Sequence, residues 1–146
     1  MRARDVVSVL ALMPSAPGVP TVGEVGGVFI VDDNAPFRSV ARAVLESGGF
    51  QVVGEAATGN GALSAVPGTT ATVVLLDIGL PDIDGFRVCA ALRRAVPGTV
   101  VVLCSVRDAD HYGSAVQRSG AAGFLQKSGL SAAAIARIVA AQDALR

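Results

Sequence analysis

Five residues that can take part in polar chemistry each stand directly behind a short, mostly apolar run. Asp32 and Asp33 follow VFIV, Asp77 follows VVLL, Ser105 follows VVVLC, and Lys127 follows GFLQ. Together they supply three carboxylates, one hydroxyl and one ammonium group. The repeated placement of a polar residue behind an apolar run predicts that one fold brings these groups to a single site.

Three carboxylates held close together repel one another, so such a cluster binds a proton or takes up a cation. Oxygen ligands without histidine or cysteine favour a hard ion, and Mg²⁺ typically binds through one or two carboxylates, waters and a phosphate. Lys127 and Ser105 are suited to contact the same anion. A carboxylate can also act as a nucleophile and form an aspartyl phosphate. Asp77 is the candidate because it stands alone, whereas Asp32 and Asp33 form a pair suited to holding metal.

The apolar runs alternate with amphipathic segments, which is typical of βαβ units and a parallel sheet. Continuous apolar runs indicate central strands covered on both faces, and shorter, more polar runs indicate edge strands. The five expected strands are residues 28–31, 73–76 and 100–104 in the centre, and 51–54 and 123–126 at the edges. In an open parallel sheet the functional crevice lies outside the carboxyl ends of the strands. The polar residues behind the runs should therefore meet there.

Helical segments are expected between the strands. In the first, Asn34 is a candidate cap, Pro36 suits the first turn, and the helix ends at Gly48-Gly49. The inner face of this helix is expected to carry Phe37, Val40, Val44 and Leu45. The last helix, alanine-rich, should begin behind a Ser131 cap. The four later helices are expected at residues 59–66, 86–96, 108–119 and 131–145.

Composition favours a single domain and argues against several classes of function. The chain has 146 residues, of which 51% are hydrophobic and 16% are charged, and its twelve basic residues balance twelve acidic ones. Without a basic run, direct binding of nucleic acid by this chain is not expected. Cys89 and Cys104 lie in apolar surroundings and are interpreted as reduced core residues of a cytoplasmic protein.

Residues 1–27, rich in proline and glycine, are interpreted as a weakly ordered N-terminal extension or as sequence read through from an early start codon. A signal peptide is disfavoured by Asp5 and by the short apolar run, and a membrane span would need about 20 apolar residues. Residues 28–146 form the expected domain.

Other motifs are weaker. Asp82 and Asp84 match part of a calcium-binding loop, but its first ligand position falls on Leu80 and its closing acid on Ala91. Turn formation and helix capping are therefore favoured for the two aspartates. His111 is the only histidine and is interpreted as a solvated helix residue. No glycine motif of a dinucleotide fold follows the first strand.

Four segments together carry a family resemblance. The runs VFIVDDNAPFR, VVLLDIGLPDIDGF and GAAGFLQKS, and the pair Cys104-Ser105 after a strand, resemble the receiver domain of two-component response regulators. The resemblance extends from Val28 to about Ala141. It implies an α/β fold of the flavodoxin-like type, a doubly wound, five-stranded parallel sheet in the order 2-1-3-4-5 within three layers.

By this resemblance Asp77 is the phosphoacceptor, and the donor is a histidine kinase or phosphotransfer protein. Asp33 and Asp77 would be direct Mg²⁺ ligands together with the backbone carbonyl of Gly79, and Asp32 would act through water. Receivers take part in phosphotransfer and can dephosphorylate themselves, but they are not metabolic enzymes.

The resemblance also implies the parts of a switch. Ser105 is similar to the hydroxyl residue that binds the phosphoryl oxygen, Lys127 to the lysine that pairs with the phosphate, and Phe124 to the aromatic switch residue. The surface around helix four, strand five and helix five would respond, and it is a possible homodimer interface.

Other functions remain open at this point. The chain could be a free-standing receiver or one cut from a longer DNA-binding regulator, which the run GAAGFLQK favours. It could be a pseudo-receiver that serves only as an interaction surface. It could also be a metal-dependent phosphohydrolase with an aspartate nucleophile, but Gly79 stands where such an enzyme needs a general acid. Gly79 and Arg107 are less typical of receivers and should influence dephosphorylation.

Overall fold

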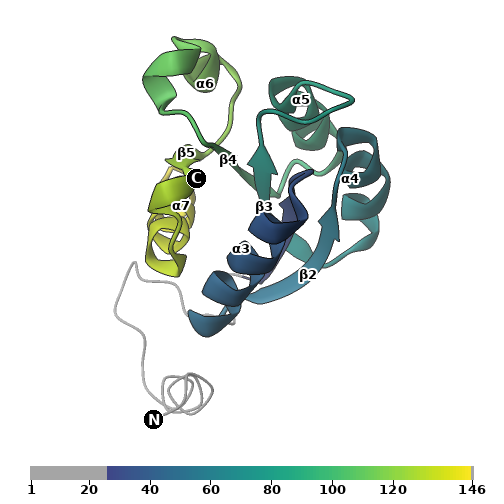
Figure 1. The fold of residues 1–146 in the computed structure, drawn as a ribbon, viewed down its shortest axis with the longest axis vertical. Coiled ribbons are helices and arrows are strands. Elements are labelled where there is room, and N and C mark those ends of the chain that lie inside the picture. The colour runs from purple at the N-terminus through teal and green to yellow at the C-terminus, as the bar shows by residue number, and fades with distance from the viewer. Residues whose placement is uncertain (1–25, 146) are drawn as a thin grey trace.

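The computed structural model describes residues 26–145 (Figure 1). The extension expected at residues 1–27 therefore lies outside the described residues, apart from its last two. Gly27 already belongs to the first strand, which begins one residue earlier than the strand expected from Val28.

A five-stranded parallel sheet forms the centre of the molecule, in the order β2-β1-β3-β4-β5. This confirms the predicted topology, with β2 and β5 at the edges. Strands β3 and β4 each extend one residue further at the carboxyl end than expected, so that they include Asp77 and Ser105. The strands are β1 (Gly27–Val31), β2 (Gln51–Ala56), β3 (Ala71–Asp77), β4 (Val100–Ser105) and β5 (Gly123–Gln126).

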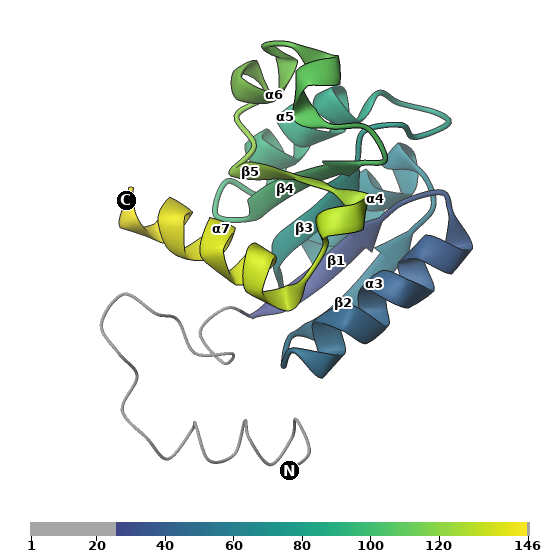
Figure 2. The same ribbon diagram turned by 60° about the vertical axis from the view of Figure 1, so that its left-hand side comes forward.

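Helices cover both faces of the sheet and complete three layers. Figures 1 and 2 show α3 (Ala35–Ser47) and α7 (Ala132–Ala144) on one face, and α4 (Gly59–Ala65) and α5 (Gly85–Ala95) on the other. Each face buries its own apolar cluster, because the central strands β1, β3 and β4 send alternate side chains to opposite sides.

Four helices cover the sheet, α3, α4, α5 and α7, and three of them begin at predicted cap residues. Asn34 Oδ1 accepts a hydrogen bond from the Phe37 amide at 2.9 Å, and Asp84 and Ser131 cap α5 and α7 in the same way. Thr58 caps α4, for which no cap was predicted.

The predicted inner face of α3 is wrong at Val40, which is 57% exposed. Ala41 and Leu45 are buried, and Phe37 packs against the same cluster. The helix lies so close to the sheet that a small residue, Ala41, occupies the central position. Val40 lies one residue away and points out of the interface.

The fourth helix, predicted at residues 108–119, does not form as one element. The chain instead makes a 3₁₀ turn, η2 (Ala109–Tyr112), and a four-residue helix, α6 (Ala115–Arg118). Gly113, with φ of 59°, interrupts the segment because a backbone in this region cannot continue a helix. Neither element has a fully buried residue, which fits the scarcity of large apolar side chains there. Two further 3₁₀ turns are η1 (Val66–Gly68) and η3 (Lys127–Gly129).

The cysteines are core residues, as predicted. Cys89 belongs to one apolar cluster and Cys104 to the other, and both are free thiols. Burial raises the pKa of each thiol, so neither is a reactive thiolate.

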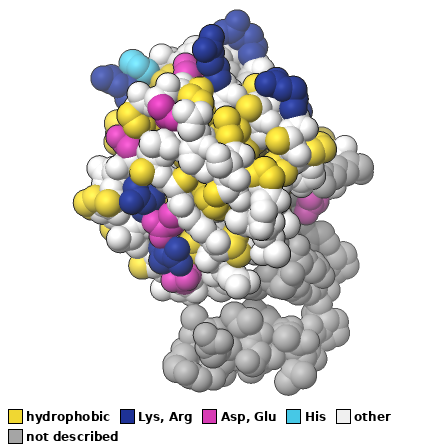
Figure 3. Space-filling model, turned by 90° about the vertical axis from the view of Figure 1, so that its right-hand side faces the viewer, with side chains coloured by type: hydrophobic (Ala, Val, Ile, Leu, Met, Phe, Trp, Pro, Cys, Tyr) yellow, Lys and Arg dark blue, Asp and Glu magenta, His cyan; other side chains and the backbone are white. Residues whose placement is uncertain are grey.

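Charged side chains of both signs are interspersed on the side of the molecule that faces right in Figure 1 (Figure 3). On α3 and β2, Glu55 joins Arg38 and Arg42 at 3.0 and 2.7 Å, and Arg42 reaches Glu46 at 3.4 Å. These pairs neutralise one another locally. Within residues 26–145, no helix has the length and apolar character needed to cross a membrane.

Candidate functional site

The carboxyl ends of four strands place the predicted site residues at one edge of the sheet. Asp32 follows β1, Asp77 ends β3, Ser105 ends β4, and Lys127 follows β5. Asp77 pairs in register with Cys104, the neighbour of Ser105, and Ser105 pairs with Gln126, the neighbour of Lys127. The sequence prediction that these groups converge is confirmed.

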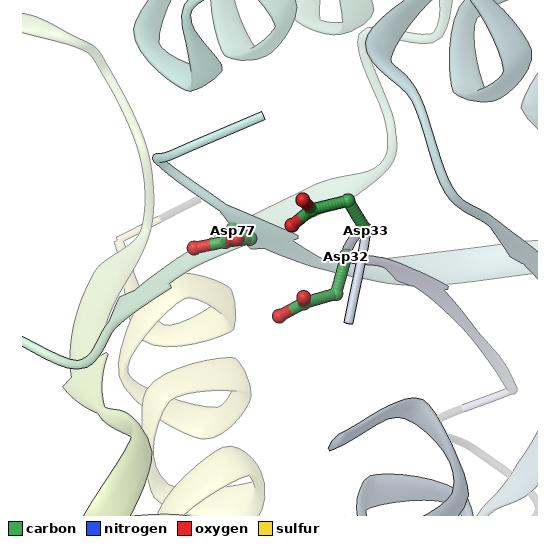
Figure 4. Close-up of side chains that lie close together, drawn as sticks. All are labelled: Asp32, Asp33 and Asp77. Atoms are coloured by element: carbon green, nitrogen blue, oxygen red, sulfur yellow. The ribbon is translucent and has the colours of Figure 1, made fainter. Parts of the chain in front are cut away.

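Asp32, Asp33 and Asp77 form a compact carboxylate cluster, shown in Figure 4. One oxygen from each lies within 4.8 Å of the others. Asp32 has no exposed surface, Asp77 is 6% exposed, and Asp33 is exposed. The cluster therefore has two buried members and one that opens to solvent.

Lys127 is the ammonium group of this cluster. Its Nζ lies 2.6 Å from Asp32 Oδ2 and 3.7 Å from Asp77 Oδ2, and it sits 4.4 Å above the centre of the Phe37 ring. Burial alone would lower the pKa of Lys127, but the hydrogen bond to Asp32 and the charge of Asp77 outweigh it and raise that pKa. Lys127 is a fixed cation at neutral pH.

The surroundings of Asp77 disfavour its ionised form. Burial, and then the negative charge of Asp32, raise the pKa of Asp77, and Lys127 offsets only part of this effect. The Gly79 amide donates a hydrogen bond to Asp77 Oδ1 at 3.3 Å. The repulsion predicted for the three carboxylates is therefore present at Asp77, the expected nucleophile.

The backbone around Asp32 is held by several bonds. Its amide donates to the Ala56 carbonyl at 3.0 Å, its own carbonyl accepts from Arg38 Nη1 at 2.6 Å, and its Oδ1 accepts from the Asn34 amide at 2.8 Å. Its Oδ2 makes the ion pair with Lys127. Arg38 was not predicted to support the site, since its role depends on the path of the chain after β1.

The cluster fits a divalent cation. Three carboxylates face one ammonium group, and all the candidate ligands are oxygens. A hard ion such as Mg²⁺ suits this donor set.

Ser105 is buried, and its hydroxyl is already engaged. Its Oγ lies 2.5 Å from Tyr112 Oη and accepts a hydrogen bond from the Arg107 amide at 3.1 Å. The Tyr112 ring also packs against Phe86 and Phe124, with ring centres 5.7 and 6.2 Å away. Phe124 thus lies near the site, as predicted, but Tyr112 was missed. A lone aromatic in a polar segment was the only sequence signal for it.

The aspartates of the following loop lie outside the cluster, as predicted. Asp84 caps α5, and Asp82 accepts hydrogen bonds from the Gly59 and Asn60 amides at 2.8 Å each. Gly85 packs against the end of β3: a Cβ there would lie 2.6 Å from the carbonyl oxygen of Asp77. His111 is exposed, as expected, and packs edge-on against Tyr112.

Comparison with known families and proteins agrees with this geometry. Residues 28–139 match the family described as the response regulator receiver domain. A probable transcriptional regulatory protein NarL of Mycobacterium tuberculosis is 41% identical over 101 residues, which cover 68% of this chain and 47% of that protein. A putative transcriptional regulator of Pseudomonas aeruginosa is 35% identical over 100 residues, covering 68% of this chain and 48% of the relative. The chain thus spans about half the length of these curated relatives.

A solved structure is similar over nearly its whole length. The signal receiver domain of the putative response regulator NarL from Mycobacterium tuberculosis superimposes with a TM-score of 0.69 and 34% identity. The match covers 82% of this chain and 97% of that one. The likeness therefore includes the sheet, the covering helices and the edge that carries the site.

Proposed function

Because this chain belongs to the family of response regulator receiver domains, we propose that Asp77 accepts the phosphoryl group by which a two-component system signals. The observation that carries the proposal is the position of Asp77 at a strand end, in one carboxylate cluster with Asp32 and Asp33 and 3.7 Å from Lys127. The proposed receiver domain spans residues 28–146.

Asp77 is suited to be the nucleophile for two reasons. It is the only one of the three aspartates that stands on the central strand β3, and its Oδ2 lies 3.7 Å from the ammonium group of Lys127. In the proposed transfer, an Asp77 oxygen forms a bond to phosphorus while the bond from phosphorus to the donor nitrogen breaks, and the donor imidazole leaves with the electron pair. Later attack by water returns the carboxylate and free phosphate.

The family uses Mg²⁺ at an acidic pocket, and the residues present fit that ion. Asp33, Asp77 and the Gly79 carbonyl would hold it, with Asp32 acting through water, and it would neutralise charge on the phosphoryl oxygens. The contacts of Asp32 support a role through water rather than as a direct ligand, because its two oxygens already face Lys127 and the Asn34 amide. Asp33 is exposed and is thus accessible to an incoming ion.

Lys127 and Ser105 would bind the phosphoryl oxygens. Lys127 supplies positive charge, and the Ser105 hydroxyl donates a hydrogen bond after turning toward Asp77. Phe124, packed against Tyr112 near the site, would respond to this movement. The surface formed by η2, α6, β5 and α7 would then differ between the two states, and it is the proposed interface for a homodimer or an output domain.

The proposed donor is a histidine kinase or phosphotransfer protein in the bacterial cytoplasm, which fits the two free thiols. Direct contact of this chain with nucleic acid is not part of the proposal, because its net charge is zero. Since the relatives are transcriptional regulators about twice as long, we propose that the receiver acts together with a DNA-binding domain.

The test is phosphorylation in solution. The chain is incubated with acetyl phosphate and Mg²⁺, and intact-protein mass spectrometry follows the gain of one phosphoryl group. We expect a single modification that hydroxylamine removes, as an acyl phosphate requires. It should be absent from Asp77→Asn and present in Asp143→Asn, an exposed control on α7.

Two results would contradict the proposal. Phosphate release over many turnovers would indicate a phosphohydrolase. If neither acetyl phosphate nor a phosphorylated kinase modified the folded protein, the chain would be a pseudo-receiver.

A further inference from the structure

Tyr112 makes a polar contact that none of the proposed roles explains. Its hydroxyl lies 2.5 Å from Ser105 Oγ, the group expected to reach the phosphoryl oxygen. Tyr112 belongs to η2, in the segment that replaces the predicted fourth helix. It therefore connects the end of β4 directly to the part of the surface that should differ between states.

The position of the Ser105 hydroxyl makes this contact a competitor of the phosphoryl group. A serine hydroxyl has one proton to donate and two lone pairs. One lone pair accepts from the Arg107 amide at 3.1 Å, and the contact with Tyr112 uses the proton or the other lone pair. A phosphoryl oxygen on Asp77 only accepts, so Ser105 must turn its proton toward the end of β3. Both present partners lie on the chain that follows β4, and Ser105 Oγ leaves them when it turns.

Tyr112 is also the main apolar attachment of its segment. Its ring packs against Phe86, His111 and Phe124, and it contacts the cluster beneath α5. No residue of η2 or α6 is fully buried.

Two glycines bracket the short helix α6. Gly113 has φ of 59° and Gly120 has φ of 77°. Backbones at these angles allow sharp changes of direction at both ends of α6. The helix α6 is therefore set off from η2 and from β5 by a turn at each end.

We propose that Tyr112 is the positioning residue that couples Ser105 to α6: it holds the Ser105 hydroxyl in the unphosphorylated state, and phosphorylation of Asp77 releases it. The inference rests on the proposed function of Asp77. Phe124 has no hydroxyl, so the hydrogen bond between side chains that links Ser105 to the switching surface is the one to Tyr112. The conformations of η2 and α6 before and after phosphorylation are then linked to the two positions of the Ser105 hydroxyl.

The coupling is reciprocal, which makes it measurable. If the bond to Tyr112 opposes phosphorylation, removing only the tyrosine hydroxyl must favour the phosphorylated state. Tyr112→Phe makes this change and keeps the ring. Phe86→Leu is the matched control, because it disturbs the packing of the Tyr112 ring but leaves its hydroxyl.

The test uses the full chain with saturating Mg²⁺ and beryllofluoride, a mimic of the phosphoryl group, and calorimetry gives the affinity. We expect Tyr112→Phe to bind beryllofluoride roughly twofold to tenfold more tightly than the parent, the range that one hydrogen bond supports. Phe86→Leu should show no such gain. In a Ser105→Ala background, the change at Tyr112 should have no effect on affinity.

Spectroscopy adds a direct readout. Tyr112 is the only tyrosine and the chain has no tryptophan, so the near-ultraviolet tyrosine signal reports this residue alone and should change when beryllofluoride binds. In nuclear magnetic resonance spectra, the amide signals of residues 107–118 in Tyr112→Phe should already be displaced toward their positions in the liganded parent.

The outcomes separate the inference from the function on which it rests. If the parent binds beryllofluoride and Tyr112→Phe binds it no better, the inference is wrong and the function of Asp77 stands. An equal gain in the Ser105→Ala background would also overturn the inference, because the effect would not pass through Ser105. If the parent does not bind the mimic at all, both proposals fail.

Discussion

Lys127 Nζ lies 2.6 Å from Asp32 Oδ2, in a carboxylate that has no exposed surface. The same ammonium group is 3.7 Å from Asp77 Oδ2. Lys127 therefore compensates the most deeply buried charge of the site before any phosphoryl group is present. A residue expected to bind phosphate is at the same time a structural counter-charge.

Replacing Lys127 should destabilise the metal-free protein. Breaking a fully buried ion pair costs roughly 3–5 kcal/mol, and because Lys127 is partly exposed we expect Lys127→Met to lower the free energy of unfolding by about 2 kcal/mol. Urea denaturation in the presence of a chelator measures this. Arg137→Met, an exposed control on α7, should have little effect, and equal losses in the two variants would contradict the role of Lys127.

Removing a carboxylate should have the opposite effect. Burial and the charge of Asp32 both disfavour the ionised form of Asp77 and raise its pKa. Asp77→Asn removes the repulsion with little change in shape, so we expect its melting temperature near neutral pH, without metal, to exceed that of the parent by a few degrees. The advantage should shrink when Mg²⁺ is added, because the parent gains the bound ion. Thermal unfolding followed by circular dichroism tests both points, and a less stable Asp77→Asn would show that the repulsion is already relieved.

The convergence of the site was predictable because it depends on a simple rule. Parallel strands end at the same edge of the sheet, so polar residues behind apolar runs suffice to bring Asp77, Ser105 and Lys127 together. The order of the strands was not contained in those runs, and it came from the family resemblance. Caps at Asn34, Asp84 and Ser131 were predictable because capping depends on the next three residues only.

The parts that escaped prediction depend on contacts between distant segments. Val40 and Ala41 are adjacent apolar residues, and only the closeness of α3 to the sheet decides which one is buried. The contact of Tyr112 with Ser105 depends on the path of η2, which local periodicity does not specify. Arg38 reaches the Asp32 carbonyl and Glu55 of another strand.

Arg38 should influence cation binding without touching the cation. Its guanidinium joins the Asp32 carbonyl at 2.6 Å to Glu55 at 3.0 Å, and an ammonium group cannot reproduce this two-sided geometry. We expect Arg38→Lys to weaken Mg²⁺ binding several-fold, since the segment that carries Asp32 and Asp33 loses a support. Calorimetry measures the affinity. Arg42→Lys is the matched control, because Arg42 also pairs with Glu55 but makes no bond to Asp32; a similar loss there would attribute the effect to Glu55.

Asp82 should make stability depend on pH in the acidic range. Hydrogen bonds from the Asn60 and Gly59 amides lower its pKa. A carboxyl with a lowered pKa binds fewer protons in the folded state, so its contribution is present above its ordinary pKa of about 3.9 and is lost as pH falls through the folded-state value. We expect Asp82→Asn to lower the urea midpoint at neutral pH, and the difference from the parent to disappear in strong acid. Asp143→Asn, which carries no such bonds, should show no comparable change with pH. A deficit of Asp82→Asn that persisted unchanged in strong acid would mean that the shape of the side chain, rather than its charge, joins this loop to α4.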